Sequence, residues 1–206
     1  MDLDLSTDVG ESPMLMQADF LLSQCELMMA SYGNPLMPIE KSLIDRCISL
    51  VYRDYLKNPR PENMPILGDL YQCLREQHNS RADDLATAME IYVPGSLSYL
   101  NHRTNVDLNN RMVCYNISKL GQGLKKLVMS NVQKHIWQRT AVNRYAGITT
   151  RIFLDEFHLL LKEPQTAAYT AEIYKRFRKW NGIPTSLTQN VKDLLDSSEI
   201  ENILEN

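Results

Sequence analysis

The sequence lacks the features that define several large classes of protein. No apolar run approaches the ~20 residues that a transmembrane helix needs, and the acidic amino terminus lacks the basic and then apolar pattern of a signal peptide. The four cysteines stand far apart, with no CxxC pair, so neither a disulfide framework nor a zinc site is expected. The scattered histidines form no HExxH motif, which argues against a metal site. A hydrophobic content of 44% excludes disorder across the whole chain.

Acidic and basic residues are segregated along the chain, although the net charge is only −3. Residues 1–30 contain six acids and no Lys or Arg, whereas residues 111–151 contain eight bases and no acid. Such blocks are typical either of solvated helix faces or of a surface that meets an oppositely charged partner. Nucleic-acid binding through 111–151 is therefore one hypothesis, but the segment lacks the interleaved aromatic residues of a single-strand platform.

The first half of the chain predicts four helices with short connections. Apolar residues recur at helical spacing in the first two segments. The expected helix starts are at Pro13, Pro38 and Pro65, and Ser80 is the expected N-cap of the fourth helix. We expect residues 1–92 to hold an acidic N-terminal segment followed by an all-α lobe.

The second half alternates strand-like and helical segments. We expect strands at 111–117, 152–154 and 183–188, and helices at about 121–141 and from Pro164 to a stop at Gly182. Two short helices are expected at 190–196 and 197–205. This order predicts parallel βαβαβ units with right-handed crossovers in residues 93–206. The fold class is therefore α/β with an all-α lobe, and Cys114 is expected to be a core thiol of the first strand.

Two acids follow the apolar strand 152–154. In a parallel sheet, Asp155 would lie at the edge where ligands bind and could hold Mg²⁺ through water, and Glu156 could activate a water for attack on a γ-phosphate. Thr188 and Gln189 end the next predicted strand, so Gln189 would lie beside both acids. From the residues alone, an ordinary acidic turn and a Gln that caps a helix remain open.

Arg176 and Arg178 belong to a basic run at 175–179. The run follows a helix whose predicted apolar stripe faces the sheet, so its bases should point away from the core. They form either a solvated basic face or an arginine finger offered to the nucleotide of a neighbouring subunit.

Several longer segments resemble the ATPases of conjugative elements. These enzymes form the VirB-four class of type IV secretion, in the HerA/FtsK-like branch of RecA-fold motors. The resemblance covers nearly the whole chain and rests on Asp45-Arg46-Cys47, residues 58–67 (NPRPENMPIL), 101–106 (NHRTNV), 152–163 (IFLDEFHLLLKE), 175–180 (KRFRKW), 182–185 (GIPT) and 188–195 (TQNVKDLL).

The resemblance implies a partial RecA-like P-loop core in residues 93–206, with the four helices as an insert. It implies that Asp155 helps to bind magnesium, that Glu156 activates water, that Gln189 and Thr188 sense the γ-phosphate, and that Arg178, with Arg176 second, acts as a finger in trans. The family uses Mg-ATP. Its members act as oligomers at the cytoplasmic, inner face of the cell membrane, with other channel components and DNA as partners, and no integral membrane segment is expected here.

One departure from the family pattern is decisive for activity. None of the eight glycines is followed by Lys, so the Walker A loop GxxxxGK[ST] is missing, and Gly121-Gln122-Gly123 is the nearest glycine-rich segment. We therefore expect a fragment of a larger motor that alone neither binds ATP tightly nor hydrolyses it. The alternative is a non-catalytic interaction module from a truncated gene, which binds a partner through its acidic helical lobe.

Overall fold

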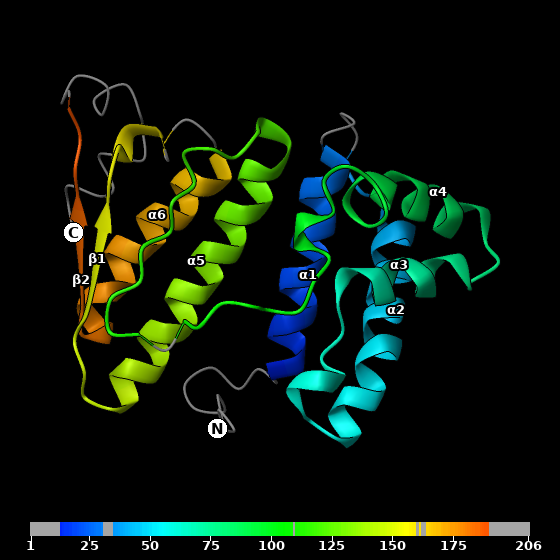
Figure 1. Ribbon diagram of the computed structural model, residues 1–206, viewed down its shortest axis with the longest axis horizontal. Coiled ribbons are helices and arrows are strands. Elements are labelled where there is room, and N and C mark those ends of the chain that lie inside the picture. Colours follow the sequence, from blue (N-terminus) through cyan, green and yellow to red (C-terminus); the bar gives the residue numbers. More distant parts are fainter. Residues whose placement is uncertain (1–12, 31–34, 109, 160, 162–163, 190–206) are drawn as a thin grey trace. The chain divides into compact units, whose positions relative to one another are not determined.

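The computed structural model describes residues 13–30, 35–108, 110–159, 161 and 164–189. The chain divides into two compact units between Leu127 and Val128 (Figure 1). The helices predicted at 190–196 and 197–205, and most of the acidic N-terminal segment, lie outside the described residues.

The first unit contains the four predicted helices, α1 (Pro13–Ala30), α2 (Pro38–Lys57), α3 (Leu67–Arg75) and α4 (Ser80–Met89). Helix α2 contacts each of the other three helices, as α4 also does. Its apolar stripe is buried, as the period of 3.6 predicts. The buried side chains of α2 to α4 are Leu43, Ile44, Cys47, Ile48, Tyr52, Leu70, Leu74, Ala82, Leu85, Ala86 and Met89.

Two helix starts differ from the prediction. Helix α3 begins at Leu67 and not at Pro65. Helix α4 is capped by Asn79 and not by Ser80, because the Asn79 side-chain oxygen accepts the backbone N–H of Arg81 at 2.9 Å. An Asn one residue earlier in the chain supplies the same capping oxygen as a Ser.

The segment after α4 belongs to the first unit, and the division between units therefore lies beyond the predicted boundary at 92/93. Two short 3-10 helices, η2 (Glu90–Tyr92) and η3 (Ser98–Leu100), fold this segment back. The Asn101 side chain accepts the Gly68 N–H at 2.7 Å and donates to the Val93 carbonyl at 3.3 Å. These bonds join the segment to α3.

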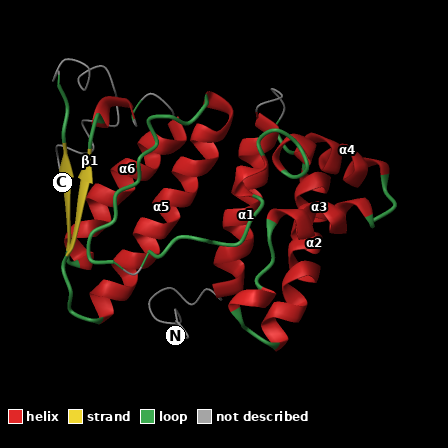
Figure 2. Cartoon of the chain, in the orientation of Figure 1, coloured by secondary structure: helices red, strands yellow, loops and turns green. Residues whose placement is uncertain are grey.

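The strand predicted at 111–117 is wrong. These residues form bends and irregular backbone, with Met112 89% exposed and Cys114 exposed, so Cys114 is not a core thiol. Strand-forming residues need a neighbouring strand for pairing, and here the Asn116 side chain instead accepts the Ser118 N–H at 3.1 Å in a local turn. Among the described residues the sheet is therefore βαβ and not βαβαβ (Figure 2).

Two of the other cysteines, Cys25 and Cys47, are buried. Burial raises the pKa of the Cys25 thiol to about 12. Burial, together with a contact from Cys73, raises the pKa of Cys47 to about 12. Thiols with such a pKa are protonated and inert at neutral pH.

The second unit holds the sheet. Most of helix α5 (Gln122–Tyr145) lies in it, followed by β1 (Thr150–Leu154), α6 (Pro164–Phe177) and β2 (Gly182–Ser186). The two strands pair in parallel, from Thr150 opposite Gly182 to Leu154 opposite Ser186. The parallel strand–helix–strand unit predicted for this region is therefore confirmed.

Helices α5 and α6 pack on one face of the sheet. Ile152 of β1 forms a buried cluster with Ile173 and Phe177 of α6, and Trp137 of α5 packs against this cluster. The Trp137 ring lies 5.8 Å from the Phe177 ring and 4.5 Å from the Trp180 ring, measured between centroids. These contacts hold α5 and α6 against β1.

Gly182 is required for close packing at the start of β2. The left-handed residue at the end of the helical segment is Asn181 (φ 54°), so Gly182 is not needed for its backbone conformation. It is needed for space, because a Cβ on Gly182 would lie 2.5 Å from Cδ2 of the buried Phe177 ring. We expect Gly182→Ala to lower the free energy of unfolding by about 1–3 kcal/mol. Urea denaturation measures this, with Gly121→Ala as the control because a Cβ there meets no atom within 4 Å. Equal unfolding midpoints for the two variants would contradict the packing argument.

Candidate functional site

The carboxyl ends of β1 and β2 carry the predicted polar residues at one edge. Pairing continues past the last strand residues, because the Leu187 N–H donates to the Leu154 carbonyl at 2.9 Å. Asp155 and Glu156 follow Leu154, and Thr188 and Gln189 follow Leu187. These four residues therefore share the edge at which open parallel sheets bind ligands.

One extra residue is inserted where β1 ends. In a regular parallel ladder, Leu187 donates to the Leu154 carbonyl and accepts the N–H two residues further on, at Glu156. Here the Phe157 N–H donates to the Leu187 carbonyl instead, at 2.9 Å. Asp155 and Glu156 thus form a β-bulge, in which Glu156 takes a left-handed φ of 49°. Bulges next to active sites turn a side chain away from the direction that the strand would give it.

Each oxygen of the Glu156 carboxylate has its own partner. The Gln189 amide donates to Oε1. Oε2 lies 3.4 Å from Nδ1 of His158, whose side chain is 16% exposed against 34% for Glu156. Nδ1 of His158 is also 3.5 Å from the Thr188 hydroxyl. The side chains of Glu156, His158, Thr188 and Gln189 therefore form one connected group at the edge.

His158 is the member of this group that the sequence analysis did not predict. The spacing of histidines in a sequence is informative mainly about metal ligation, for which paired histidines are the signal. The signal that could have found it is its position two residues after Glu156, in a short turn that follows a parallel strand.

The turn that carries these residues is anchored in the core of the second unit. Phe157 and Leu161 are buried with Ala167 and Ala171 of α6. The Phe157 ring also lies 6.0 Å from that of Tyr174, measured between centroids. The short helix η4 (Phe157–Leu159), which includes His158, is therefore held against α6.

Asp155 is exposed, and its Oδ1 accepts the Glu156 N–H at 3.0 Å. No group of three or more His, Cys, Asp or Glu side chains that could hold a metal ion occurs in the described part of the chain. A single exposed carboxylate at a strand end suits Mg²⁺, which keeps several waters and binds through one or two carboxylates plus substrate phosphates. It does not suit a cation held entirely by protein ligands.

The two arginines differ in their contacts. Arg176 forms an ion pair with Glu172 one turn earlier in α6 and lies over the Trp137 ring at 5.8 Å. Arg178 is exposed, and no carboxylate of the described residues lies within salt-bridge distance of it. Of the two, Arg178 thus has the guanidinium available for a further partner.

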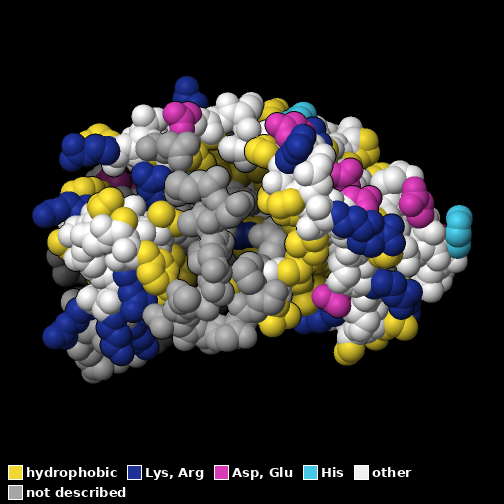
Figure 3. Space-filling view, turned by 90° about the horizontal axis from the view of Figure 1, so that it is seen from below, with side chains coloured by type: hydrophobic (Ala, Val, Ile, Leu, Met, Phe, Trp, Pro, Cys, Tyr) yellow, Lys and Arg dark blue, Asp and Glu magenta, His cyan; other side chains and the backbone are white. Residues whose placement is uncertain are grey.

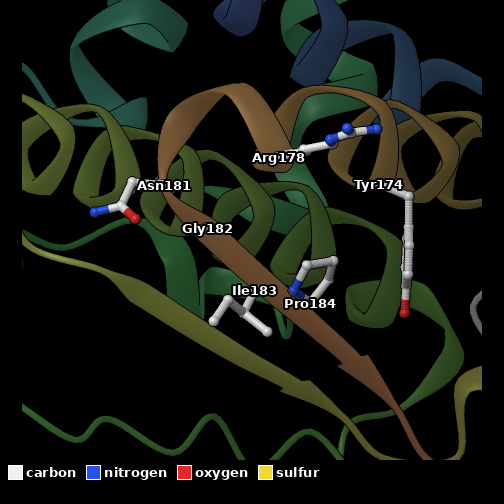
Figure 4. Close-up of a pocket in the computed structure, with 6 residues that line it drawn as sticks. All are labelled: Tyr174, Arg178, Asn181, Gly182, Ile183 and Pro184. Carbon is white, nitrogen blue, oxygen red and sulfur yellow. The ribbon is translucent and has the colours of Figure 1, made fainter.

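Arg178 lines a surface cavity of about 450 Å³ beside the start of β2. The other lining residues are Tyr174, Asn181, Gly182, Ile183 and Pro184. The close-up shows the Arg178 side chain directed away from the strand (Figure 4). Because Gln189 follows the opposite end of the strand, Arg178 and the Glu156 group belong to different ends of β2.

The basic segment 111–151 does not form a single structural feature. Its residues divide between the two units. Arg144 lies over the Trp180 ring at 5.1 Å, and burial lowers the pKa of Lys134 to about 8. On the face seen in Figure 3, Lys and Arg side chains of the second unit are interrupted by hydrophobic and other side chains. Part of the positive charge thus has a structural role.

The glycine-rich segment 121–123 begins a helix. Gly121 accepts the N–H groups of Leu124 and Lys125 at 3.1 Å each, in the first turn of α5. These backbone groups form hydrogen bonds of the helix. The segment also lacks the Lys of a phosphate-binding loop. Among the described helices, none combines the length and the apolar character that a membrane crossing requires.

Comparison with known proteins gives a match of fold and no match of sequence family. No model of a known protein family matches the sequence, and no curated protein matches it. The structure of VirB4 of Thermoanaerobacter pseudethanolicus is similar, with a TM-score of 0.70 over 94% of this chain at 20% sequence identity. The match covers 54% of the VirB4 chain, so this chain spans about half its length. The resemblance inferred from sequence motifs is thus confirmed at the level of structure, and the chain has the fold of part of VirB4.

Proposed function

We propose that this chain is the Walker B half of a type IV secretion ATPase, in which the carboxyl edge of β1 and β2 faces the γ-phosphate of Mg-ATP. The observation that carries the proposal is the group formed by Glu156, His158, Thr188 and Gln189 at that edge. A carboxylate and an amide that lie together at the ends of adjacent parallel strands can bind a water molecule and a phosphate group.

Glu156 is the proposed base. Its carboxylate accepts from Gln189 through one oxygen and contacts His158 through the other, so its orientation is fixed before substrate binds. A carboxylate fixed in this way orients the attacking water and accepts its proton. Gln189 and Thr188 donate from the neighbouring strand end toward the γ-phosphate.

Asp155 is the residue that would hold Mg²⁺ through water. When bound, Mg²⁺ would neutralise the charge that develops on the phosphate oxygens. Asp155 also holds the Glu156 N–H, so it stabilises the bulge that aims the base.

The face of the sheet opposite α5 and α6 supports a larger core. Parallel sheets are normally covered on both faces. Here the face opposite α5 and α6 exposes Phe153 (65% exposed), Ile183 and Leu187. An element that covers these side chains, and a phosphate-binding loop, would come from the part of the motor that matches the remainder of the VirB4 fold.

The same proposal extends to the assembly, partners and location of the motor. The four helices of the first unit would be an insert in the motor core. We propose that the complete motor assembles from several copies, works with other components of a conjugation or secretion channel and with DNA, and acts in the cytoplasm at the inner face of the cell membrane. By "complete motor" we mean the assembly in which these residues are joined or bound to a phosphate-binding loop.

The first test is nucleotide binding by residues 1–206 alone. Without backbone amides and a lysine around the β- and γ-phosphates, we expect isothermal titration with Mg-ATP to give a Kd weaker than about 1 mM. The complete motor should bind and hydrolyse Mg-ATP. A micromolar Kd for residues 1–206 would contradict the proposed division of the site, and a complete motor that does not hydrolyse ATP would favour the non-catalytic interaction module.

A further inference from the structure

We propose that His158 is a positioning residue for the Glu156 carboxylate. This inference rests on the proposed function, because it concerns the residue taken there as the base. Three observations carry it: the contact between Nδ1 and Oε2, the position of His158 in a buried turn, and the bond from Gln189 to the other carboxylate oxygen.

The imidazole connects the two strand ends. Nδ1 lies 3.4 Å from Oε2 of Glu156, in the turn after β1, and 3.5 Å from the hydroxyl of Thr188, which follows β2. A carboxylate only accepts hydrogen bonds. We therefore infer that Nδ1 of His158 carries a proton, which faces Oε2 of Glu156.

The position of His158 is more restricted than that of Glu156. Phe157 on one side and Leu161 on the other are buried under α6, and the His158 side chain is only 16% exposed. Glu156 has a left-handed backbone and a flexible side chain that is 34% exposed. His158, whose position is restricted, thus orients the more mobile Glu156 side chain. Gln189 alone would contact only Oε1 and leave Oε2 without this contact.

Loss of this contact should affect chemistry more than binding. A base displaced by about 1 Å can cost on the order of 100-fold in rate, whereas substrate affinity depends on other groups. In the complete motor we expect His158→Ala and His158→Gln to lower kcat for ATP hydrolysis at least about tenfold, with KM within about twofold.

The conservative variant separates positioning from folding. The Asn amide nitrogen can occupy the place of Nδ1, whereas the longer Gln side chain places its amide nearer to Nε2. We expect His158→Asn to retain kcat within about threefold of the unaltered motor. His102→Ala, at an exposed loop position, is the control and should change neither constant. If Asn serves no better than Gln and Ala, or if no variant lowers kcat, the inference is overturned.

A second measurement tests the contact on residues 1–206 without ATP hydrolysis. Nitrogen-15 shifts of the neutral imidazole report which ring nitrogen bears the proton. We expect the Nδ1–H form to predominate, and Glu156→Ala to shift the population toward Nε2–H. A predominant Nε2–H form that Glu156→Ala leaves unchanged overturns the inference. If Glu156→Gln leaves hydrolysis unimpaired, the proposed function fails; if Glu156→Gln abolishes hydrolysis but His158 variants do not reduce it, only the inference fails.

Discussion

Glu156→Gln should reduce kcat for ATP hydrolysis by the complete motor at least about 100-fold, while the Kd for Mg-ATP changes by less than about threefold. The amide keeps the size of the side chain and can still contact Gln189 and His158. It cannot accept a proton from water. The substitution therefore removes the proposed chemistry with little change in structure.

The measurement is steady-state hydrolysis together with binding of Mg-ATP under the same conditions. Glu62→Gln, which makes the same chemical change at an exposed position of the first unit, should leave both quantities unchanged. If Glu156→Gln retains a third or more of the turnover, another group activates the water, and the assignment of Glu156 is wrong.

Arg178→Ala should lower kcat by about 1,000-fold and leave Mg-ATP binding nearly unchanged, because an arginine finger stabilises charge that develops in the transition state. Arg178 is exposed, has no carboxylate partner among the described residues, and lies near the end of β2 opposite to Gln189. These features favour action on the nucleotide of a neighbouring subunit. Lys175→Ala, an exposed base of α6, is the matched control and should have little effect.

Mixed assemblies test whether Arg178 acts in trans. A Glu156→Gln subunit still carries Arg178, and an Arg178→Ala subunit still carries Glu156. We expect titration of one into the other to restore part of the turnover at mixed interfaces. If mixed assembly is verified and no ratio restores turnover, Arg178 acts within its own subunit or is only a surface charge.

The parallel unit and its polar edge could be predicted from sequence because their signals are local. A short apolar strand that ends in two acids, a helix and a second strand suffice to bring Asp155 and Gln189 to one edge. The bond between Glu156 and Gln189 follows from that topology. The starts of α2 and α6 were also predictable, since Pro38 and Pro164 stand at their first positions.

The strand predicted at 111–117 shows where local propensity is insufficient. Residues such as Val113 and Tyr115 favour strands, but a strand forms only where a partner offers its backbone groups. No described strand pairs with this segment. Asn116 supplies a side-chain oxygen for a local turn instead.

The bulge at Asp155 and Glu156 could not be predicted either. A bulge is defined by which N–H reaches Leu187 across the sheet, and the residues themselves do not reveal this. The position of His158 two residues after Glu156 was a signal in the sequence, whereas the bulge that sets the direction of Glu156 was not.

The most direct test of the central claim is the structure of the complete motor bound to Mg²⁺ and a non-hydrolysable ATP analogue. The account predicts the γ-phosphate within hydrogen-bond distance of Gln189, a water between that phosphate and Glu156, and Mg²⁺ joined to Asp155 through water. A nucleotide bound away from the carboxyl ends of β1 and β2, with Asp155 and Glu156 in bulk solvent, would contradict it.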